Sequence, residues 1–322
     1  MILTTVCSSP DASIVLAYSA SSGIINWQRE GHSSRLHIIG HLLPRGDKDD
    51  DELVFLNFIN SHHVLYVTGQ AAVVIDVSNL NSSRYENAPY NSGDSKFVIR
   101  RIALPCRCVC MDILDSGFVI TGDDGNVYRI DDNGRVLSSF RPCESGHIRS
   151  IKVVNENCYI IGTNSELLLV NPFSNPHITS SYKLPTGSFV ESVSIDSRKN
   201  WFCAVLASQS HTSRLVVGST KCLATVFESQ EPLFVSQCSF AETSSNGLCV
   251  IASGATPQLL LLPLDLSSAI PRIQFDPTED VCAVLTTHST PKGDLIVMAG
   301  VGPSVLLISA QSLSIVHRFT LD

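Results

Sequence analysis

The sequence repeats one hydrophobic pattern seven times. Each copy has four or five apolar residues, a glycine or serine, a short polar turn and a second apolar run. In the third copy, Phe118–Gly122 is followed by the turn Asp123–Asn126 and by Val127–Asp131. Apolar runs this short, bounded by turn residues, favour β-strands, because helices need longer segments with a 3.6-residue period. The repeat therefore restricts the chain to many short strands.

The length of the repeat is given by the spacing between the small residues that end the first run of each copy. These residues are Ser19, Gly69, Gly122, Gly162, Ser208, Gly254 and Gly300. Successive steps are 50, 53, 40, 46, 46 and 46 residues, and seven units of 46 account for all 322 residues. A step of about 40–45 residues with strand chemistry is typical of one β-propeller blade.

We therefore predict an all-β fold: a seven-bladed β-propeller with four antiparallel strands per blade, as a single domain over residues 1–322. Two other all-β arrangements stay open, a pair of sandwiches and an eight-bladed ring. Helical signals are nearly absent, because glycine and proline interrupt the chain about every ten residues.

Two further strands are predicted for most repeats. The upstream candidates are almost continuously apolar, as strands buried on both faces should be. They are Leu53–Phe58, Cys108–Ile113, Ile148–Val154, Val190–Ile195 and Val281–Leu285. The downstream candidates are more polar, as edge strands with one wet face should be. They are Arg35–Ile39, Phe97–Ile102, Val136–Phe140, Ile178–Leu184 and Ile315–Phe319.

The two ends of the chain bear on how a ring would close. An upstream strand, Ile2–Val6, comes first in the sequence, and a downstream strand ending at Phe319 comes last. Each blade is therefore expected to be contiguous in sequence, without an exchange of strands between the termini.

Composition excludes several classes of protein. Charged residues make up 16% of the chain, against about 25% in an average protein. Apolar residues make up 44%. This composition excludes a disordered chain. The formal charge of −8 argues against a free-standing nucleic-acid binder. The start of the sequence does not read as a secretory signal, and the 11 cysteines are scattered through apolar runs. We therefore expect reduced thiols and a location in the nucleus or cytoplasm.

The repeats resemble those of the WD40-repeat family in a degenerate form, over the whole chain. Gly146-His147 precedes an upstream strand, where that family has its Gly-His pair. Asp76 and Asp131 end third strands where the family has Trp-Asp, but isoleucine replaces the tryptophan. The resemblance implies a propeller. Its structural repeat positions would be Gly69, Gly122, Gly146, His147, Gly162, Gly254 and Gly300. His147 is expected to hydrogen-bond between blades.

A narrower similarity is to the non-catalytic WD-repeat subunit of the tRNA (guanine-N7) methyltransferase. It covers less than a quarter of the chain. The segments that carry it are Arg107–Ile113, Asp124–Tyr128, Gly146–Arg149, Phe240–Thr243 and Gly247–Val250. This resemblance implies a catalytic methyltransferase subunit as partner. Acidic residues stand at Asp123 and Asp124 where that family tends to have lysine, and a basic C-terminal tail is missing.

The sequence offers no motif for catalysis. There is no Gly-x-Ser-x-Gly, phosphate-binding or dinucleotide-binding motif, and no His-Glu-x-x-His. The spacing of Cys106, Cys108 and Cys110 predicts three thiols on one face of a strand, which we interpret as a buried face and not as a metal site. We expect no catalytic residue, no metal and no cofactor.

One region is rich in basic residues. It spans 46 residues and contains Arg84, Lys96, Arg100, Arg101, Arg107 and Arg129. The long polar loop 78–95 overlaps its first part. Two interpretations stay open: a patch that binds RNA phosphates or an acidic protein surface, and separate solvated arginines on outer strands.

The sequence leaves three functions open. The first is a non-enzymatic scaffold that mediates protein–protein interactions within a multisubunit complex. The second is the non-catalytic subunit of a tRNA methyltransferase complex, with an RNA contact. The third is a propeller enzyme with its site in the central channel, whose sign would be converging carboxylates or histidines with shifted pKa values.

Overall fold

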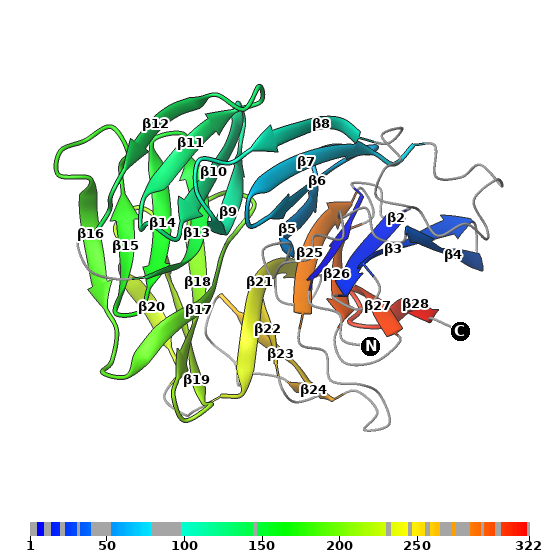
Figure 1. Cartoon of the computed structure of the whole chain (residues 1–322). Coiled ribbons are helices and arrows are strands. Elements are labelled where there is room, and N and C mark those ends of the chain that lie inside the picture. The colour runs from blue at the N-terminus through cyan, green and yellow to red at the C-terminus, as the bar shows by residue number, and fades with distance from the viewer. Residues whose placement is uncertain are drawn as a thin grey trace. The chain divides into compact units, whose positions relative to one another are not determined.

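Seven four-stranded antiparallel sheets make up the described part of the chain in a computed structural model (Figure 1). The structure describes residues 5–9, 14–19, 23–30, 33–39, 53–78, 98–143, 147–229, 233–243, 247–254, 258–264, 272–274, 284–290, 293–299 and 304–320. In every sheet the strands are hydrogen-bonded in their order along the sequence. The prediction of an all-β fold with four antiparallel strands per repeat is confirmed.

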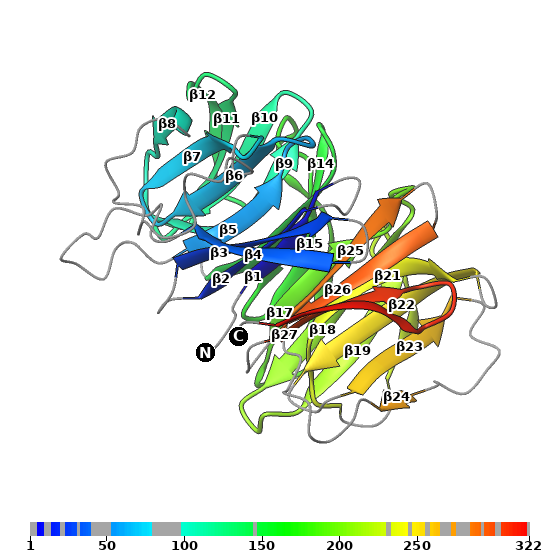
Figure 2. The same cartoon turned by 90° about the vertical axis from the view of Figure 1, so that its right-hand side faces the viewer.

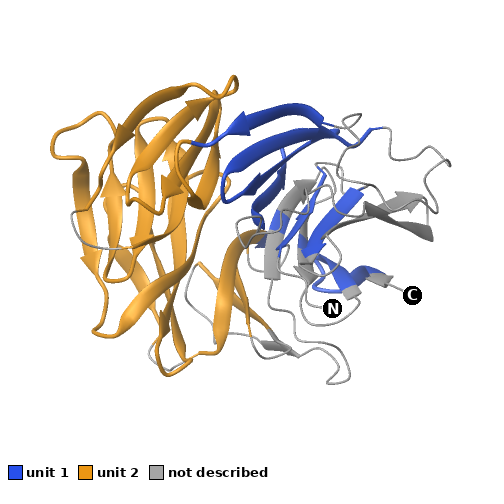
Figure 3. Cartoon of the chain, in the orientation of Figure 1, with its two compact units in different colours: residues 1–104, 242–245, 277–322 blue, residues 105–241, 246–276 orange. Residues whose placement is uncertain are grey.

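The strands divide between two compact units (Figure 3). Unit 1 holds three sheets. The first has β1 (Thr5–Ser8), β2 (Ile14–Ser19), β3 (Gly23–Glu30) and β4 (Ser33–Ile39). The second has β5 (Leu53–Phe58), β6 (His63–Thr68), β7 (Ala71–Asp76) and β8 (Val98–Ala103). The third has β25 (Val284–Thr290), β26 (Gly293–Ala299), β27 (Ser304–Ser309) and β28 (Ile315–Thr320).

Unit 2 holds the other four sheets. The first has β9 (Cys108–Leu114), β10 (Gly117–Gly122), β11 (Val127–Asp131) and β12 (Val136–Phe140). The second has β13 (Ile148–Asn155), β14 (Cys158–Thr163), β15 (Glu166–Val170) and β16 (Ile178–Lys183). The third has β17 (Ser188–Ile195), β18 (Trp201–Ser208), β19 (Ser213–Ser219) and β20 (Thr225–Glu228). The fourth has β21 (Val235–Thr243), β22 (Gly247–Gly254), β23 (Gln258–Pro263) and β24 (Arg272–Gln274) (Figure 2).

Most predicted strands lie where the hydrophobic pattern placed them. Leu53–Phe58 and Val136–Phe140 coincide with β5 and β12. The predicted strand Val281–Leu285 lies mostly outside the described residues, and β25 begins at Val284. The first and last sheets are each built from consecutive strands, so the prediction that the termini exchange no strand is confirmed. That residues 1–322 form a single domain stays a prediction.

In unit 1 the core lies between the first two sheets. Leu16 of β2 packs with Leu56, Tyr66 and Ile75 of the second sheet, and all four are almost fully buried. Strand β1 contacts β5 of the second sheet, and it also contacts β25 and β26 of the third. The first strands β25, β1 and β5 are therefore neighbours in that order.

In unit 2 three hydrophobic clusters join successive sheets face to face. Between the first two sheets, Val119 packs against Ile151 and Ile161. The next cluster joins the second sheet to the third, and another joins the third to the fourth. Strand β13 contacts both β9 and β17. Each unit is thus a stack of twisted sheets in which one face covers the next.

The small residues of the repeat are needed where other parts of the chain approach the strand closely. A Cβ atom on Gly162 would lie 2.5 Å from Val190 Cγ1 of the next sheet, and one on Gly254 would lie 2.1 Å from the Phe234 carbonyl oxygen. Gly69 and Gly122 are also buried at or just after the ends of second strands. Gly146 and Gly300 lie outside the described residues. Close packing explains why the repeat keeps a small residue there.

Candidate functional site

Four first strands contain residues that their pairing with the second strand skips. The skipped residues are Val54 in β5, Val109 in β9, Arg149 and the buried Val154 in β13, and Glu191 in β17. Such β-bulges re-aim a side chain and recur next to binding sites. The bulges therefore mark the first strands as places where the repeat presents residues instead of only packing them.

Three of these residues form a group on unit 2, which we name the bulge row: Val109, Arg149 and Glu191. They stand on β9, β13 and β17, and β13 contacts the strands on either side of it. Val109 is 42% exposed, and the side chains of Arg149 and Glu191 are 40% and 36% exposed. The row therefore offers an apolar, a cationic and an anionic side chain on three neighbouring strands.

Arg149 holds the centre of the bulge row. Its Nη2 lies 3.8 Å from Glu191 Oε2, and its guanidinium carbon lies 4.2 Å from the centre of the Phe189 ring. Exposed ion pairs and cation–π contacts each contribute about 1 kcal/mol or less. These contacts orient the guanidinium without using up its hydrogen-bonding capacity, because a guanidinium has five donors.

Further polar contacts tie β9 to β13. Asp112 Oδ2 accepts a hydrogen bond from the Val153 N–H at 2.7 Å, and Lys152 Nζ lies 3.6 Å from Asp112 Oδ1. Within the first sheet, between β9 and β10, Cys110 Sγ lies 2.9 Å from Thr121 Oγ1, and burial raises the pKa of the Cys110 thiol to about 12. The two strands that carry Val109 and Arg149 are therefore held in a fixed relation.

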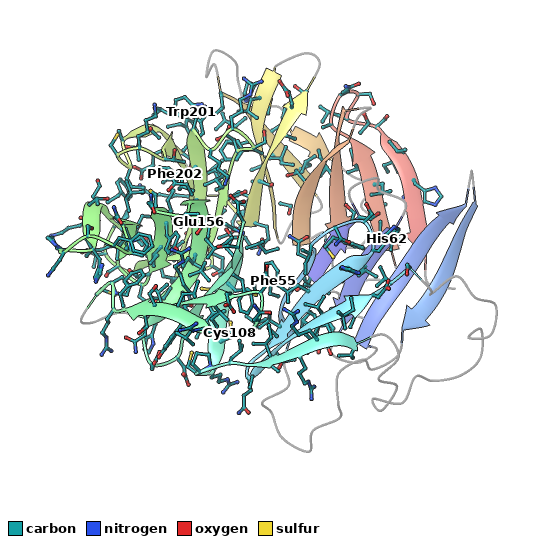
Figure 4. All side chains as sticks on the ribbon, turned by 90° about the horizontal axis from the view of Figure 1, so that it is seen from above. Phe55, His62, Cys108, Glu156, Trp201 and Phe202 are labelled. Atoms are coloured by element: carbon teal, nitrogen blue, oxygen red, sulfur yellow. The ribbon has the colours of Figure 1, made fainter. Side chains whose placement is uncertain are left out.

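Arg129 takes part in a second contact between the first two sheets of unit 2. It forms an ion pair with Glu156, which lies in the turn between β13 and β14 (Figure 4). Glu156 Oε1 also accepts a hydrogen bond from the Asp115 N–H at 3.2 Å. The Arg129 guanidinium carbon lies 5.2 Å from the centre of the Phe173 ring. With its side chain only 11% exposed, Arg129 is a structural contact and not an open cationic surface.

Two other residues of the predicted basic region, Arg100 and Arg101, lie on opposite faces of their sheet. Arg100 pairs with Val74 and Arg101 with Val73, so these neighbours point to opposite faces of the sheet. Arg107 is exposed just before β9. Arg84 and Lys96 lie outside the described residues. A common basic patch stays a prediction.

The prediction that the cysteines share one strand face is wrong. Cys106 precedes β9, and the bulge at Val109 pairs Cys108 with Gly122 and Cys110 with Thr121. Because Thr121 and Gly122 are consecutive, Cys108 and Cys110 point to opposite faces. Among the described residues, no group of three His, Cys, Asp or Glu side chains could hold a metal ion.

Sequence reasoning missed the bulge row. His147, singled out for its place before a strand, is exposed, whereas the residue that presents its side chain in that strand is Arg149. One signal was available: Arg149 and Glu191 place a charge directly after the first apolar residue of their candidate strands. The described part of the chain contains no helix, so none that could span a membrane.

Comparisons with known proteins identify the fold. No family model and no curated protein matches the sequence. By contrast, 1331 chains of known structure match, so the architecture is common and does not by itself select a function. One is the WD40 domain of Pan2 from Neurospora crassa, at 12% identity and a TM-score of 0.65, over 92% of this chain and 85% of that one. The chain folds as a WD40-like β-propeller.

Proposed function

We propose that the protein is a non-enzymatic scaffold that binds other proteins within a multisubunit complex, and that the bulge row is one of its contact surfaces. The observation that carries this is the exposure of Val109, Arg149 and Glu191 on three neighbouring strands. Residues built on strands present side chains more accurately than residues on loops. Arginine is also enriched among the residues that dominate protein interfaces. A single ring of seven blades over residues 1–322 is part of the proposal.

The experiment compares three forms of the full chain, each tagged and purified from its native source. The test variant is Arg149→Ala with Glu191→Ala. The control is Arg214→Ala with Glu228→Ala, which removes another exposed ion pair of unit 2, at 3.0 Å. We expect wild type and control to retain a stoichiometric partner and the test variant to lose it.

One result would contradict the scaffold function and another would contradict only the role of the bulge row. One is a wild-type protein that elutes alone at its own mass of 34.9 kDa. The other is a test variant that keeps every partner while folding normally, which would remove the bulge row from the proposal.

The tRNA methyltransferase alternative rests on the resemblance of five short segments, including Gly146–Arg149, which leads into β13 and carries Arg149. Under this alternative the partner would be a catalytic methyltransferase subunit. Deleting the gene and measuring N7-methylguanosine in tRNA separates the two proposals. An unchanged level discards the alternative and leaves the general scaffold in place.

A propeller enzyme has less support. Among the described residues, the carboxyl groups with shifted pKa values are Asp76 and Asp124, and both pKa values are lowered. For Asp76 the main cause is hydrogen bonding from Ser78. For Asp124, hydrogen bonds from Tyr128 and Asn126 outweigh the opposing effect of burial. Each group has partners within its own turn, so the two do not form a converging acid–base pair.

A further inference from the structure

The fourth strands share an irregularity of their own. In five sheets the fourth strand has one residue more than its pairing with the third strand uses, and the skipped residue is always the second of the strand. These residues are Ile99 in β8, Leu137 in β12, Thr179 in β16, Val226 in β20 and Val316 in β28. The same irregularity at the same place in five sheets indicates a feature of the repeat and not a local accident.

The two remaining fourth strands lack a bulge. Strand β24 is three residues long and pairs over three positions. Strand β4 pairs with β3 over seven consecutive positions, from Ile39 opposite Ile24 to Ser33 opposite Glu30, without a break. Of the seven described fourth strands, β4 alone combines length with a regular backbone.

Every fourth strand is the last of its sheet, so its outer edge pairs with no other described strand. Such an edge is a template for an added strand, because its N–H and C=O groups repeat at a regular spacing. An extra residue interrupts that spacing and increases the local twist. We propose that the second-position bulges close five edges to strand addition, that shortness closes β24, and that β4 is the edge left open to an extended segment of a protein partner.

This inference names a second mode of partner binding and rests on the proposed scaffold function only for the existence of a partner. The skipped side chains permit a rival explanation. Ile99, Leu137, Val226 and Val316 are 42–50% exposed, so the apolar groups themselves could be the feature that matters. Scattered exposed aliphatic residues are common on proteins and need no partner. The two explanations differ in what removal of the side chain alone should do.

Strand β12 allows the explanations to be separated. Deleting Leu137 would make the pairs Arg129–Ser138 and Ile130–Val136 consecutive, and every other pair would keep its register. The deletion therefore removes the bulge without moving the rest of the strand. Leu137→Ser is the matched control, because it removes the apolar group and keeps the extra residue. Deletion of Val226 and Val226→Ser repeat the comparison in β20.

The readouts are sedimentation velocity from micromolar to near-millimolar concentration and amide hydrogen exchange. Thermal unfolding first establishes that each variant is folded. If a β12 variant is not folded, the two β20 variants replace it in the comparison. We expect the deletion variants to self-associate and to gain protection of at least tenfold in residues 136–140 or 225–228. The serine variants should behave as wild type. In the wild type, any amide protection that increases with protein concentration should be located in residues 33–39.

Three outcomes would overturn the proposal: folded deletion variants that remain like wild type, serine variants that change as much as the deletions, or wild-type association through a bulged edge. None of these depends on Arg149 or Glu191. The experiments could therefore contradict the scaffold function and still confirm the closed edges. They could also contradict the closed edges and leave the scaffold function in place.

In β4 the opposite change, an insertion that creates a bulge, should close the edge. One leucine inserted between Ser33 and Ser34 would place an extra residue at the second position, as in the five bulged strands. The probe is a labelled peptide with the sequence of β3, Gly23–Glu30, an extended segment that pairs antiparallel with β4 along its inner edge. We expect it to protect residues 33–39 of wild type, and the insertion to weaken binding at least tenfold. Equal binding to both forms, or protection elsewhere, would contradict an open β4 edge.

Discussion

Arg149 and Glu191 lie on neighbouring first strands, each is skipped by the pairing within its own sheet, and their charged groups are 3.8 Å apart. The same register irregularity thus brings two opposite charges to the surface from two sheets. An exposed pair of this kind adds little to stability. Its small expected effect on stability agrees with the proposed role of the bulge row as a contact surface.

Two of the ion pairs between sheets, Arg129–Glu156 and Arg149–Glu191, should differ in their effect on stability. Glu156→Ala removes the partner of a nearly buried arginine and the acceptor of the Asp115 N–H. It should lower the free energy of unfolding by about 1–3 kcal/mol. Glu191→Ala removes an exposed partner and should cost less than about 1 kcal/mol. Urea unfolding measures both, and equal losses would show that the Arg129 contact is not structural.

Gly162→Ala tests the close approach of two sheets in unit 2. The new methyl group would meet the Val190 side chain at 2.5 Å, so the protein should lose about 1–3 kcal/mol of stability. Val190→Ala in the same chain removes Cγ1 and Cγ2, at 2.5 and 3.1 Å, but keeps Cβ at 2.7 Å, so it relieves the clash only in part. The double variant should therefore be less destabilised than the sum of the two single variants. Additive losses in urea unfolding would mean that the sheets separate to accept the methyl group.

Two leucines in left-handed backbone form a matched pair. Leu223 and Leu313 each have a φ of 54° in the turn between a third and a fourth strand. Leu223 is 3% exposed and packs against the preceding sheet, whereas Leu313 is half-buried. Leu223→Gly should cost about 2–4 kcal/mol through lost packing. Leu313→Gly should change stability by less than about 1 kcal/mol, because relief of strain offsets the smaller loss.

The buried thiols should make the protein sensitive to alkali. Burial raises the pKa of Cys203 well above its ordinary value of 9.0, and a hydrogen bond with Cys238 acts in the same direction. A raised folded-state pKa gives stability that is complete below pH 9 and is lost as the pH rises above it, because the unfolded thiol ionises first. Cys203→Ala should therefore reduce the loss of unfolding free energy that occurs as the pH rises above 9. Cys222→Ala, at an exposed position, should leave it unchanged.

The sequence predicted the strands well because turn residues and apolar runs are local signals. Asp123–Asn126 had to be a turn, and Phe118–Gly122 and Val127–Asp131 had to flank it as strands. The bulges were not predictable in this way, because one extra residue leaves a run just as apolar. Val109 shows the consequence: the bulge turns Cys108 and Cys110 to opposite faces, and it exposes a valine in an apolar strand.

The basic region illustrates a different limit. Closeness in sequence left open whether the basic residues share a surface, and strand alternation separates Arg100 from Arg101. Arg129 is instead held by Glu156, which lies 27 residues further along the chain. Which cation meets which anion depends on how sheets stack, and that is not encoded in local spacing.

Photo-crosslinking from position 109 tests the central claim most directly. A photoreactive amino acid replaces Val109 in the full chain in its native cells, and the same residue at position 137 on β12 is the control. The account predicts a defined protein adduct at position 109 that disappears with Arg149→Ala and Glu191→Ala, and no such adduct at position 137. A folded protein that forms no adduct at position 109, or forms the same adduct at both positions, would contradict it.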